Sequence, residues 1–425
     1  MKLLIKNGRA IDPANRINRV SDILIEKDKI SKIGSNLKDK GAEVIEAEGM
    51  IVAPGLFDMH THLRQPGRED AEDFISASKA AAKGGFTSIT AMPNTNPACD
   101  NRGIVEYVIS EAKRSAVVNI FAIGAITKER KGEDLAEIAD MKDAGAVAIT
   151  DDGASVKNAQ IMRKALEYSS MFDIPTICHC EDLDLSQNGV MNEGFASTLL
   201  GLKGIPNISE SSIVARDIAL AAFTKARIHI AHVSTKESVE LIRQAKAKGV
   251  NVTAETCPHY FTLTDEATKT FNTNTKINPP LRTQQDKKAV IEGLEDDTID
   301  VIATDHAPHT EADKDVEFDV APFGIIGLET ALSLAINELV DNKILTWDKL
   351  IKKMSFLPSE ILKLPSKGRL SAGADADIVI IDPDKRWVFA KELIASKSKN
   401  SPFIGRKFKG AAAVTICGGK IVYRT

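Results

Sequence analysis

Six histidine and aspartate residues lie at the ends of short apolar runs, where together they could bind metal ions. They are His60, His62, Asp152, His179, His232 and Asp305. Imidazole nitrogens and carboxylate oxygens are common ligands of zinc and related ions. The carboxyl ends of the strands of a parallel barrel meet at one face, so these side chains would converge there. The pattern therefore predicts a hydrolytic site that holds two metal ions.

The first apolar run, residues 50–59, indicates how the polar residues at its end are used. His60 and His62 are two residues apart, so in an extended strand both imidazoles point to one face and can bind the same ion. Asp58 continues that face and is expected to support the ligands. Arg64 also continues it, and a guanidinium binds a carboxylate through two parallel hydrogen bonds. We therefore expect an anionic substrate.

Two adjacent aspartates, Asp151 and Asp152, follow the run from Val147 to Thr150. Two neighbouring ions need an anion between them, and a carboxylate can offer one oxygen to each. Side chains alternate along an extended strand, so one aspartate would point into the barrel and the other away from it. The spacing alone leaves the choice between them open.

A further histidine, His229, lies three residues before His232 and would fall on the opposite strand face. We expect it to pack in the core or to support a ligand rather than to bind metal. His259, near the end of a later strand, receives no role from the sequence.

The composition is that of a globular protein, with 43% hydrophobic and 27% charged residues. A chain of 425 residues predicts one large and one small domain. The net charge of −4 gives no electrostatic reason to expect nucleic acid or an anionic membrane as a partner. No apolar stretch approaches the roughly 18 residues of a membrane-spanning helix. Five cysteines, an odd number, favour a reducing, cytoplasmic setting.

Eight strand-like runs alternate with helical patterns through the middle of the chain. The expected strands are residues 50–60, 86–94, 118–126, 146–152, 174–180, 227–234, 250–259 and 300–306. Helical periodicity lies between most of them, at residues 71–85, 103–115, 133–145, 158–172, 211–226 and 235–249. Gly84, Gly145 and Gly249 suit helix C-termini. Eight such units predict an α/β fold of the (β/α)8 TIM-barrel type, with its chemistry at the carboxyl ends of the strands.

The two ends of the chain instead carry short β-type runs with turn signals between them. These are residues 3–12, 21–34 and 42–52 at one end, and 376–389 and 411–424 at the other. Gly418 and Gly419 are typical of a two-residue hairpin turn. We expect residues 1–53 and 365–425 to form one small β-sandwich domain, and residues 54–364 to form a metal-dependent hydrolase barrel.

Several motifs, taken together, resemble the dihydroorotases of the amidohydrolase superfamily, in their long-chain type I branch. They are GLFDMHTHLRQPGRED at 55–70, PNT at 93–95, TDDG at 150–153, HCE at 179–181, HVS at 232–234, TCPHY at 256–260, INPPLR at 277–282 and TDHAPH at 304–309. The similarity extends over essentially the whole chain, including GRLSAGADADIVIID at 368–382. The H-x-H motif is shared by the whole superfamily, whereas its combination with TDDG and TDHAPH is much more specific.

The resemblance implies a role for each candidate residue. One ion would be bound by His60, His62 and Asp305 and the other by His179 and His232, with Asp152 as the bridge. Asp305 would also be catalytic, because it could carry a proton from the attacking water to the leaving amide nitrogen. The substrate would be bound by His62, Arg64, Asn94, Asn278, His309, Phe323 and Gly324. The charged segment 310–320 would be a solvated loop, or a lid over the site.

The activity that this resemblance implies is the reversible, zinc-dependent hydrolysis of dihydroorotate to N-carbamoyl-L-aspartate in pyrimidine synthesis. It implies one or two zinc ions per chain and a homodimer, and it leaves open a complex with aspartate transcarbamoylase. One alternative is another cyclic amidohydrolase, such as an allantoinase or hydantoinase, in which a carboxylated lysine bridges the ions. The nearest following lysine here, Lys157, lies five residues beyond Asp152. The other alternative, a non-catalytic subunit, would have lost ligands that this chain keeps.

Overall fold

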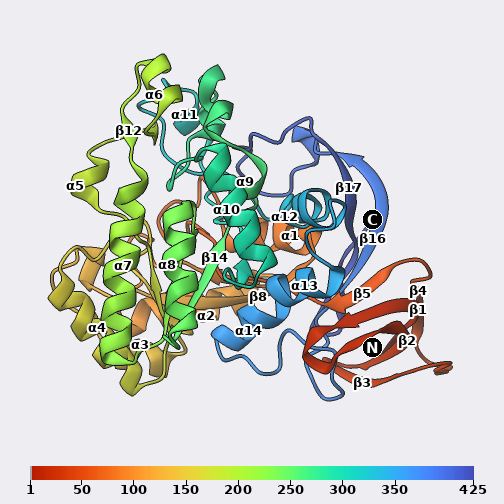
Figure 1. The fold of residues 1–425 in the computed structure, drawn as a ribbon. Coiled ribbons are helices and arrows are strands. Elements are labelled where there is room, and N and C mark those ends of the chain that lie inside the picture. The colour runs from red at the N-terminus through yellow and green to blue at the C-terminus, as the bar shows by residue number, and fades with distance from the viewer. Residues whose placement is uncertain (1) are drawn as a thin grey trace.

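The computed structural model describes residues 2–425, and its larger part is a barrel of eight parallel strands (Figure 1). In pairing order these are β6 (Leu56–Asp58), β7 (Phe86–Ala91), β8 (Asn119–Gly124), β9 (Ala148–Ile149), β10 (Thr176–Cys178), β13 (Ile228–Ile230), β14 (Val252–Thr256) and β15 (Val301–Ile302). Each of them lies inside one of the eight runs predicted as strands. The prediction of a (β/α)8 barrel is therefore confirmed.

The first and last barrel strands are joined just beyond their carboxyl ends. Thr61 and His306 form an isolated parallel bridge, and the His62 amide donates to the His306 carbonyl at 2.8 Å. The buried carboxylate of Asp58 accepts from the amides of His60 and Thr304, each at 3.1 Å. Asp58 therefore ties the two ends of the barrel together at the level where the predicted ligands begin.

Helices follow most barrel strands and surround the barrel (Figure 1). All six predicted helices are present: α1 (Phe74–Gly84), α2 (Arg102–Ser115), α3 (Ile138–Ala144), α4 (Ala159–Met171), α7 (Asn207–Thr224) and α8 (Lys236–Ala247). The later ones are α9 (Pro258–Thr262), α10 (Gln284–Glu295), α11 (Glu311–Lys314), α12 (Ala331–Ala335), α13 (Trp347–Ile351) and α14 (Leu357–Ile361). Two π-helical turns, Ile336–Val340 and Lys352–Phe356, continue α12 and α13.

Glycines end two of these helices as predicted. Gly145 and Gly249 have φ angles of 110° and 74°, in the left-handed region that glycine adopts without steric cost. In α1 the left-handed residue is Gly85, at φ 90°, rather than Gly84. A Cβ on Gly84 would lie 2.1 Å from the Leu328 carbonyl oxygen, so close packing requires glycine at that position.

The strands of both termini form one second sheet (Figure 1). They are β1 (Lys2–Asp12), β2 (Ile17–Glu26), β3 (Lys29–Gly34), β4 (Glu43–Glu46), β5 (Ile51–Pro54), β16 (Ile378–Val388), β17 (Lys407–Cys417) and β18 (Lys420–Arg424). β5 pairs with both β1 and β16, so the predicted composite β unit is one continuous sheet. Gly418 and Gly419 form the predicted hairpin turn between β17 and β18.

The first predicted strand is divided between the two sheets. β5 ends at Pro54 and β6 begins at Leu56, with Gly55 between them. A Cβ on Gly55 would lie 2.1 Å from Thr87 Oγ1, so the crossing from one sheet to the other requires glycine. The boundaries proposed for the two domains, at residues 53 and 365, stay predictions.

A segment between β10 and α7 projects beyond the barrel and lies outside the elements predicted from the sequence (Figure 1). It contains α5 (Leu183–Ser186), β11 (Met191–Asn192), α6 (Phe195–Leu200) and β12 (Gly204–Ile205). Val190, Met191 and Ala196 form a small buried cluster with Phe318, which comes from the loop after α11. The projecting segment therefore packs against the loop that follows the last barrel strand.

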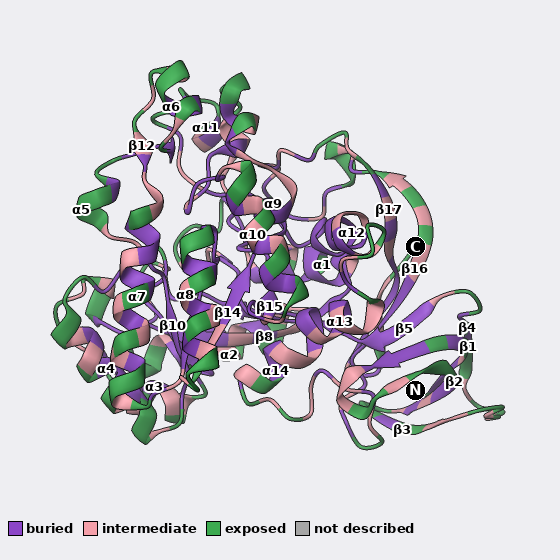
Figure 2. Cartoon of the chain, viewed as in Figure 1, coloured by how far each residue is buried: buried purple, intermediate pink, exposed green. Residues whose placement is uncertain are grey.

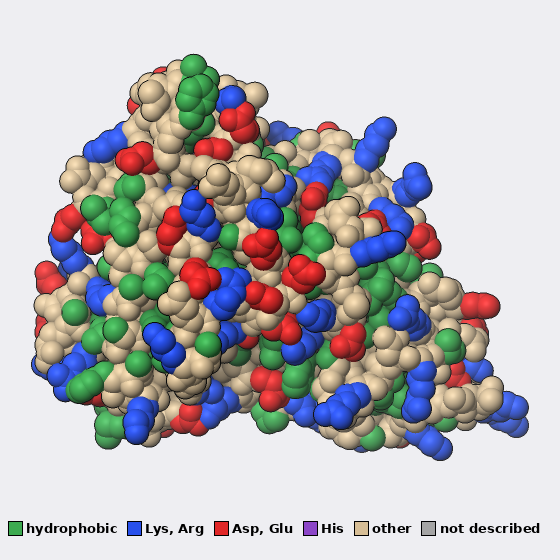
Figure 3. Space-filling model, in the orientation of Figure 1, with side chains coloured by type: hydrophobic (Ala, Val, Ile, Leu, Met, Phe, Trp, Pro, Cys, Tyr) green, Lys and Arg blue, Asp and Glu red, His purple; other side chains and the backbone are tan. Residues whose placement is uncertain are grey.

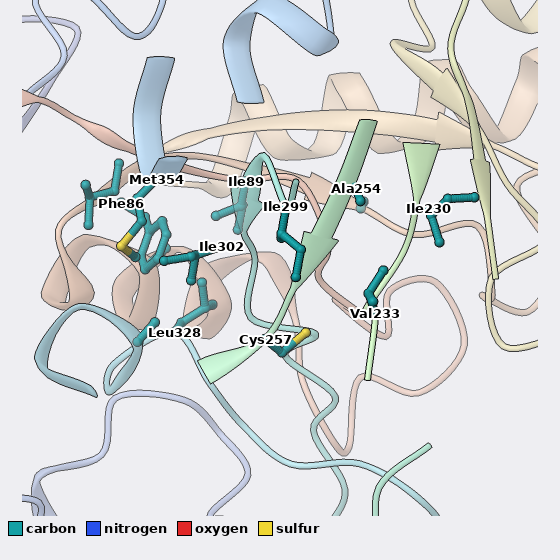
Figure 4. Close-up of a cluster of buried hydrophobic side chains, with 14 of the residues drawn as sticks. Phe86, Ile89, Ile230, Val233, Ala254, Cys257, Ile299, Ile302, Leu328 and Met354 are labelled. Carbon is teal, nitrogen blue, oxygen red and sulfur yellow. The ribbon is translucent and has the colours of Figure 1, made fainter. Parts of the chain in front are cut away.

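Burial is greatest in the barrel strands and in the helix faces that cover them (Figure 2). Figure 4 shows part of this core, in which Ile89, Ile230, Ala254 and Ile302 come from four barrel strands. Acidic and basic side chains are interspersed over the face seen in Figure 3. None of the helices within residues 2–425 combines the length and apolar character needed to cross a membrane.

Candidate metal centre and substrate cavity

The structure brings all six predicted ligands into one buried cluster at the carboxyl ends of the barrel strands. Asp152 is at its middle: Oδ1 lies 3.4 Å from a ring nitrogen of each of three histidines, and Oδ2 lies 3.4 Å from His62 Nε2. The three histidines are His60, His179 and His232. Asp305 Oδ1 lies 3.0 Å from His62 Nε2 and 3.6 Å from His60 Nε2.

This cluster fits metal ions better than it fits an empty core. Within residues 2–425, His60 Nε2 and Asp152 Oδ1 are buried and have no hydrogen-bond partner. Buried polar atoms normally have one, so these two are expected to have another partner. Ligand atoms of His60, Asp152 and His232 lie within 4.8 Å of one another, as do those of His60, His62 and Asp305. The arrangement could therefore hold two ions with Asp152 between them.

The two adjacent aspartates point in different directions. The Asp151 carboxylate accepts hydrogen bonds from the amides of Ile126, at 2.8 Å, and Thr127, at 3.0 Å, and from the Thr127 hydroxyl. Its oxygens are therefore occupied by the loop after β8, away from the histidines. Asp152 faces the histidines instead, so the geometry favours Asp152 over Asp151 as the residue between the ions.

Three of the imidazoles are supported by side chains that contact their second ring nitrogen. Glu255 Oε1 lies 2.5 Å from His60 Nδ1, Asn94 Oδ1 lies 2.8 Å from His62 Nδ1, and Glu181 Oε2 lies 3.2 Å from His179 Nε2. Such contacts fix the orientation and the tautomer of a ligand histidine. Sequence reasoning assigned no role to Glu255 or Glu181. Two features of the sequence could have pointed to them. Glu255 is an acidic residue inside an apolar strand, and Glu181 lies two residues after the candidate ligand His179.

Several residues at the strand ends adopt left-handed backbone conformations, which sequence alternation does not predict. The φ angles are 62° at Arg64, 33° at His232 and 48° at Asp305. His229 and His232 were expected on opposite faces, and His229 Nε2 lies 3.2 Å from Glu255 and His232 contacts Asp152. His229 therefore lies behind His60 rather than among the candidate ligands, where it was expected to pack or to support a ligand, while His232 reaches the ligand cluster with a left-handed backbone.

A cavity of about 200 Å³ opens onto the metal cluster. It is lined by every residue predicted to bind substrate: His62, Arg64, Asn94, Asn278, His309, Phe323 and Gly324. Asp152, His179, His232 and Asp305 line it as well, whereas His60 lies behind them and is fully buried. Five of the six candidate ligands and all of the candidate substrate contacts therefore face a single space.

Arg64 and His309 lie side by side in this cavity. Arg64 Nε donates to the Pro308 carbonyl at 3.0 Å, and Arg64 Nη2 lies 3.3 Å from His309 Nε2. His309 Nε2 also lies 2.8 Å from the Phe323 carbonyl oxygen. Burial lowers the pKa of Arg64 to about 10, so it is still charged at neutral pH. Burial, together with the Arg64 charge, lowers the pKa of His309 to about 3, so His309 is neutral.

Of the remaining polar residues near the site, His306 and Asn278 have hydrogen-bond partners, whereas Nε2 of the buried His259 has none within residues 2–425. His306 Nδ1 accepts from the Gly327 amide at 3.1 Å, and its backbone carbonyl helps to close the barrel, so His306 has a structural role here. Asn278 Nδ2 donates to Glu181 Oε2 at 2.9 Å, so the carboxylate that contacts His179 also holds Asn278 at the cavity wall. His259 is buried and contacts the ring of Tyr260.

Two buried lysines hold the charged segment that follows His309. Lys314 Nζ donates to the carbonyls of Thr273, at 3.1 Å, and Pro322, at 2.7 Å. Lys276 Nζ donates to the Asp319 carbonyl at 2.8 Å and lies 4.8 Å from the centre of the Phe323 ring. These contacts join the segment to the cavity wall that carries Phe323.

Replacing Lys314 by alanine is expected to loosen residues 310–322. Two carbonyls lose their donor, at a cost of about 1–3 kcal/mol. Limited proteolysis should therefore cut this segment several-fold faster, and KM should rise more than kcat falls. Lys391→Ala is the control, because Lys391 makes an exposed ion pair with Glu311 in the same region, worth at most about 1 kcal/mol. Equal cleavage rates in the two variants would show that Lys314 does not hold the segment.

Comparison with known proteins agrees with this geometry. A family model described as "Dihydro-orotase-like" matches residues 49–238. A protein named "Dihydroorotase" from Acetivibrio thermocellus is 55% identical over 99% of each chain, and one from Geotalea daltonii is 54% identical over 100% of each. Among solved structures, the L-hydantoinase of Arthrobacter aurescens superposes with a TM-score of 0.90 at 26% identity, covering 99% of this chain and 96% of the other.

The hydantoinase structures have the same fold as this chain. Their sequence identity to it is about half that of the dihydroorotases. The sequence relatives also match along the full length of the chain, so the likeness includes both the barrel and the sheet formed by the termini. The chain therefore belongs to the dihydroorotase family of metal-dependent amidohydrolases.

Proposed function

We propose that this protein is a dihydroorotase that hydrolyses dihydroorotate to N-carbamoyl-L-aspartate and catalyses the reverse ring closure. The observation that supports this most directly is the single cavity with a guanidinium on one wall and the histidine–aspartate cluster on another. Dihydroorotate has a carboxylate beside a cyclic ureide. With its carboxylate on Arg64, its ring amide would face the cluster.

In this proposal zinc is the metal, although the same ligands also suit other divalent ions. His60, His62 and Asp305 would hold one ion, His179 and His232 would hold the other, and Asp152 lies where it could serve both. Such ions lower the pKa of water toward neutrality and polarise a carbonyl group.

The side chains of the protein supply the remaining steps. Arg64, Asn94 and His309 orient the substrate carboxylate, and Asn278, Phe323 and Gly324 contact the ring. Asp305 accepts a proton from the attacking water and passes it to the amide nitrogen as the ring opens. That nitrogen needs the proton, because an amide anion is a very poor leaving group.

A hydantoinase-like activity is the nearest alternative, and the position of Lys157 argues against it. That family places a carboxylated lysine between the ions. Here Lys157 Nζ pairs with Asp184 at 2.6 Å, and both side chains are more than half exposed. The retention of all six candidate ligands likewise argues against a non-catalytic subunit.

We further propose a homodimer in a reducing, cytoplasmic setting, and we leave open a complex with aspartate transcarbamoylase. The cytoplasmic setting is supported by the five cysteines, all of which are buried and free. Analytical ultracentrifugation of the purified chain, alone and with an aspartate transcarbamoylase, tests both assemblies.

The test is an assay of the purified, zinc-supplemented chain for dihydroorotate ring opening and carbamoyl-aspartate closure, with hydantoin and allantoin alongside. Bound metal is counted on the same sample. We expect turnover of dihydroorotate alone, its loss after chelation and its return with zinc. A chain that binds metal but turns over hydantoin or allantoin instead would refute the proposal.

A further inference from the structure

A buried chain of polar side chains extends away from the metal cluster behind His60. His60 Nδ1 lies 2.5 Å from Glu255 Oε1, and Glu255 Oε2 lies 3.2 Å from His229 Nε2. His229 Nδ1 lies 2.8 Å from Thr253 Oγ1, which also contacts the Ile228 carbonyl at 3.4 Å. His60, Glu255 and His229 are all fully buried, so solvent does not screen these contacts.

The strand register explains why these residues meet. Glu255 lies on β14, two residues after Thr253, and His229 pairs with Thr253 across the β13–β14 ladder. Glu255 therefore comes within reach of His229 on the neighbouring strand and of His60 at the end of β6. Burying a carboxylate without a partner is costly, and the His60 imidazole offsets part of that cost, whereas Glu255 Oε2 lies beside His229 Nε2 without a hydrogen bond between them.

This arrangement leaves His60 with one free ring nitrogen, and that nitrogen faces the cluster. A carboxylate at Nδ1 requires the proton on Nδ1, so the lone pair of Nε2 points toward Asp152 Oδ1, at 3.4 Å, and Asp305 Oδ1, at 3.6 Å. A negative charge behind an imidazole also makes it a stronger donor to a metal.

We propose that Glu255, with His229 beside its other oxygen, is a positioning residue that fixes the tautomer of His60 and thereby sets the affinity of the ion bound by His60, His62 and Asp305. This inference rests on the proposed function, because it assumes a metal at that cluster. It assigns a role in metal binding to His229 on β13 and Glu255 on β14, neither of which lines the substrate cavity.

The supports of the other two imidazoles differ from this one. His62 is supported by the neutral amide of Asn94, and His179 by Glu181, which is 11% exposed and shares an oxygen with Asn278. Glu255 is 1% exposed and its two oxygens contact only histidine nitrogens among the described side chains. Removing the charge of Glu255 should therefore lower the affinity for the ion at His60 and leave the affinity for the other ion largely unchanged.

The experiment compares zinc affinities by competition with a chromophoric chelator for the wild type, Glu255→Gln, His229→Gln and Glu329→Gln. Glu329 is the matched control: its buried carboxylate accepts from the amides of Ala395 and Ser396 and contacts Lys83, outside the cluster. We expect Glu255→Gln to weaken binding of the ion held by His60, His62 and Asp305 by about 10- to 100-fold, with a smaller loss in His229→Gln and none in Glu329→Gln.

Unfolding temperatures with and without zinc separate positioning from a general loss of structure. A positioning role predicts that Glu255→Gln loses much of the zinc-dependent rise in unfolding temperature and that the visible spectrum of its cobalt-loaded form changes. If Glu255→Gln bound zinc as tightly as the wild type, this inference would be overturned while the proposed function would stand. If Glu255→Gln does not fold, unchanged affinity in His229→Gln overturns it. A wild-type chain that binds no metal would overturn the inference and the proposed function together.

Discussion

Replacing Asp152 by alanine is expected to remove one bound ion and to lower kcat/KM for dihydroorotate by on the order of 10³-fold or more. Asp152 is the carboxylate that lies between all four candidate histidines, with Oδ1 toward three of them and Oδ2 toward His62. Without it, four neutral imidazoles would have to hold two divalent cations with Asp305 as the single remaining anion. Metal counting by plasma emission and steady-state kinetics on the same preparation measure both effects.

The adjacent residue provides the control for this variant. Asp151→Ala is expected to keep both ions and most of the activity, because the Asp151 oxygens face Ile126 and Thr127. It should still destabilise the fold by about 1–3 kcal/mol, since those amides lose their acceptor. Loss of metal in Asp151→Ala, with metal retained in Asp152→Ala, would overturn the assignment of the bridge.

Replacing Arg64 by methionine is expected to lower kcat/KM for dihydroorotate by roughly 30- to 1,000-fold, equivalent to about 2–4 kcal/mol. Methionine keeps most of the side-chain volume but leaves the substrate carboxylate without its cationic partner. Arg64→Lys should recover only part of the loss, because an ammonium cannot form the two parallel hydrogen bonds of a guanidinium.

Dihydrouracil, which has the same ring without the carboxylate, distinguishes recognition from damage to the site. We expect the wild type to hydrolyse dihydrouracil slowly, at a rate that is nearly the same in Arg64→Met. Arg68→Met is the matched protein control, because Arg68 is on the same segment but is half exposed and pairs with Asp70 and Asp313. If dihydrouracil and dihydroorotate lost activity equally in Arg64→Met, Arg64 would be a structural residue rather than the carboxylate contact.

The sequence alone determined the barrel, the composite sheet and the six candidate ligands, and its resemblance to the dihydroorotases supplied the residues expected to contact substrate. Eight apolar runs with period-two or continuous hydrophobicity predicted eight strands, and each run contains one. Local signals were sufficient where a feature depends on neighbours along the chain. Gly418 and Gly419 predicted a hairpin turn, and Gly145 predicted a helix end, because only the local backbone conformation matters there.

Other features depended on the tertiary structure, because they join residues that are far apart in the chain or break the regular alternation of a strand. The choice between Asp151 and Asp152 depends on the amides of Ile126 and Thr127, which donate to the Asp151 carboxylate and so leave Asp152 to the histidines. His232 reaches Asp152 with a left-handed backbone conformation that the alternation of a regular strand does not predict. Glu255 meets His60 across 195 residues of sequence, so only the closed barrel brings the carboxylate to the imidazole.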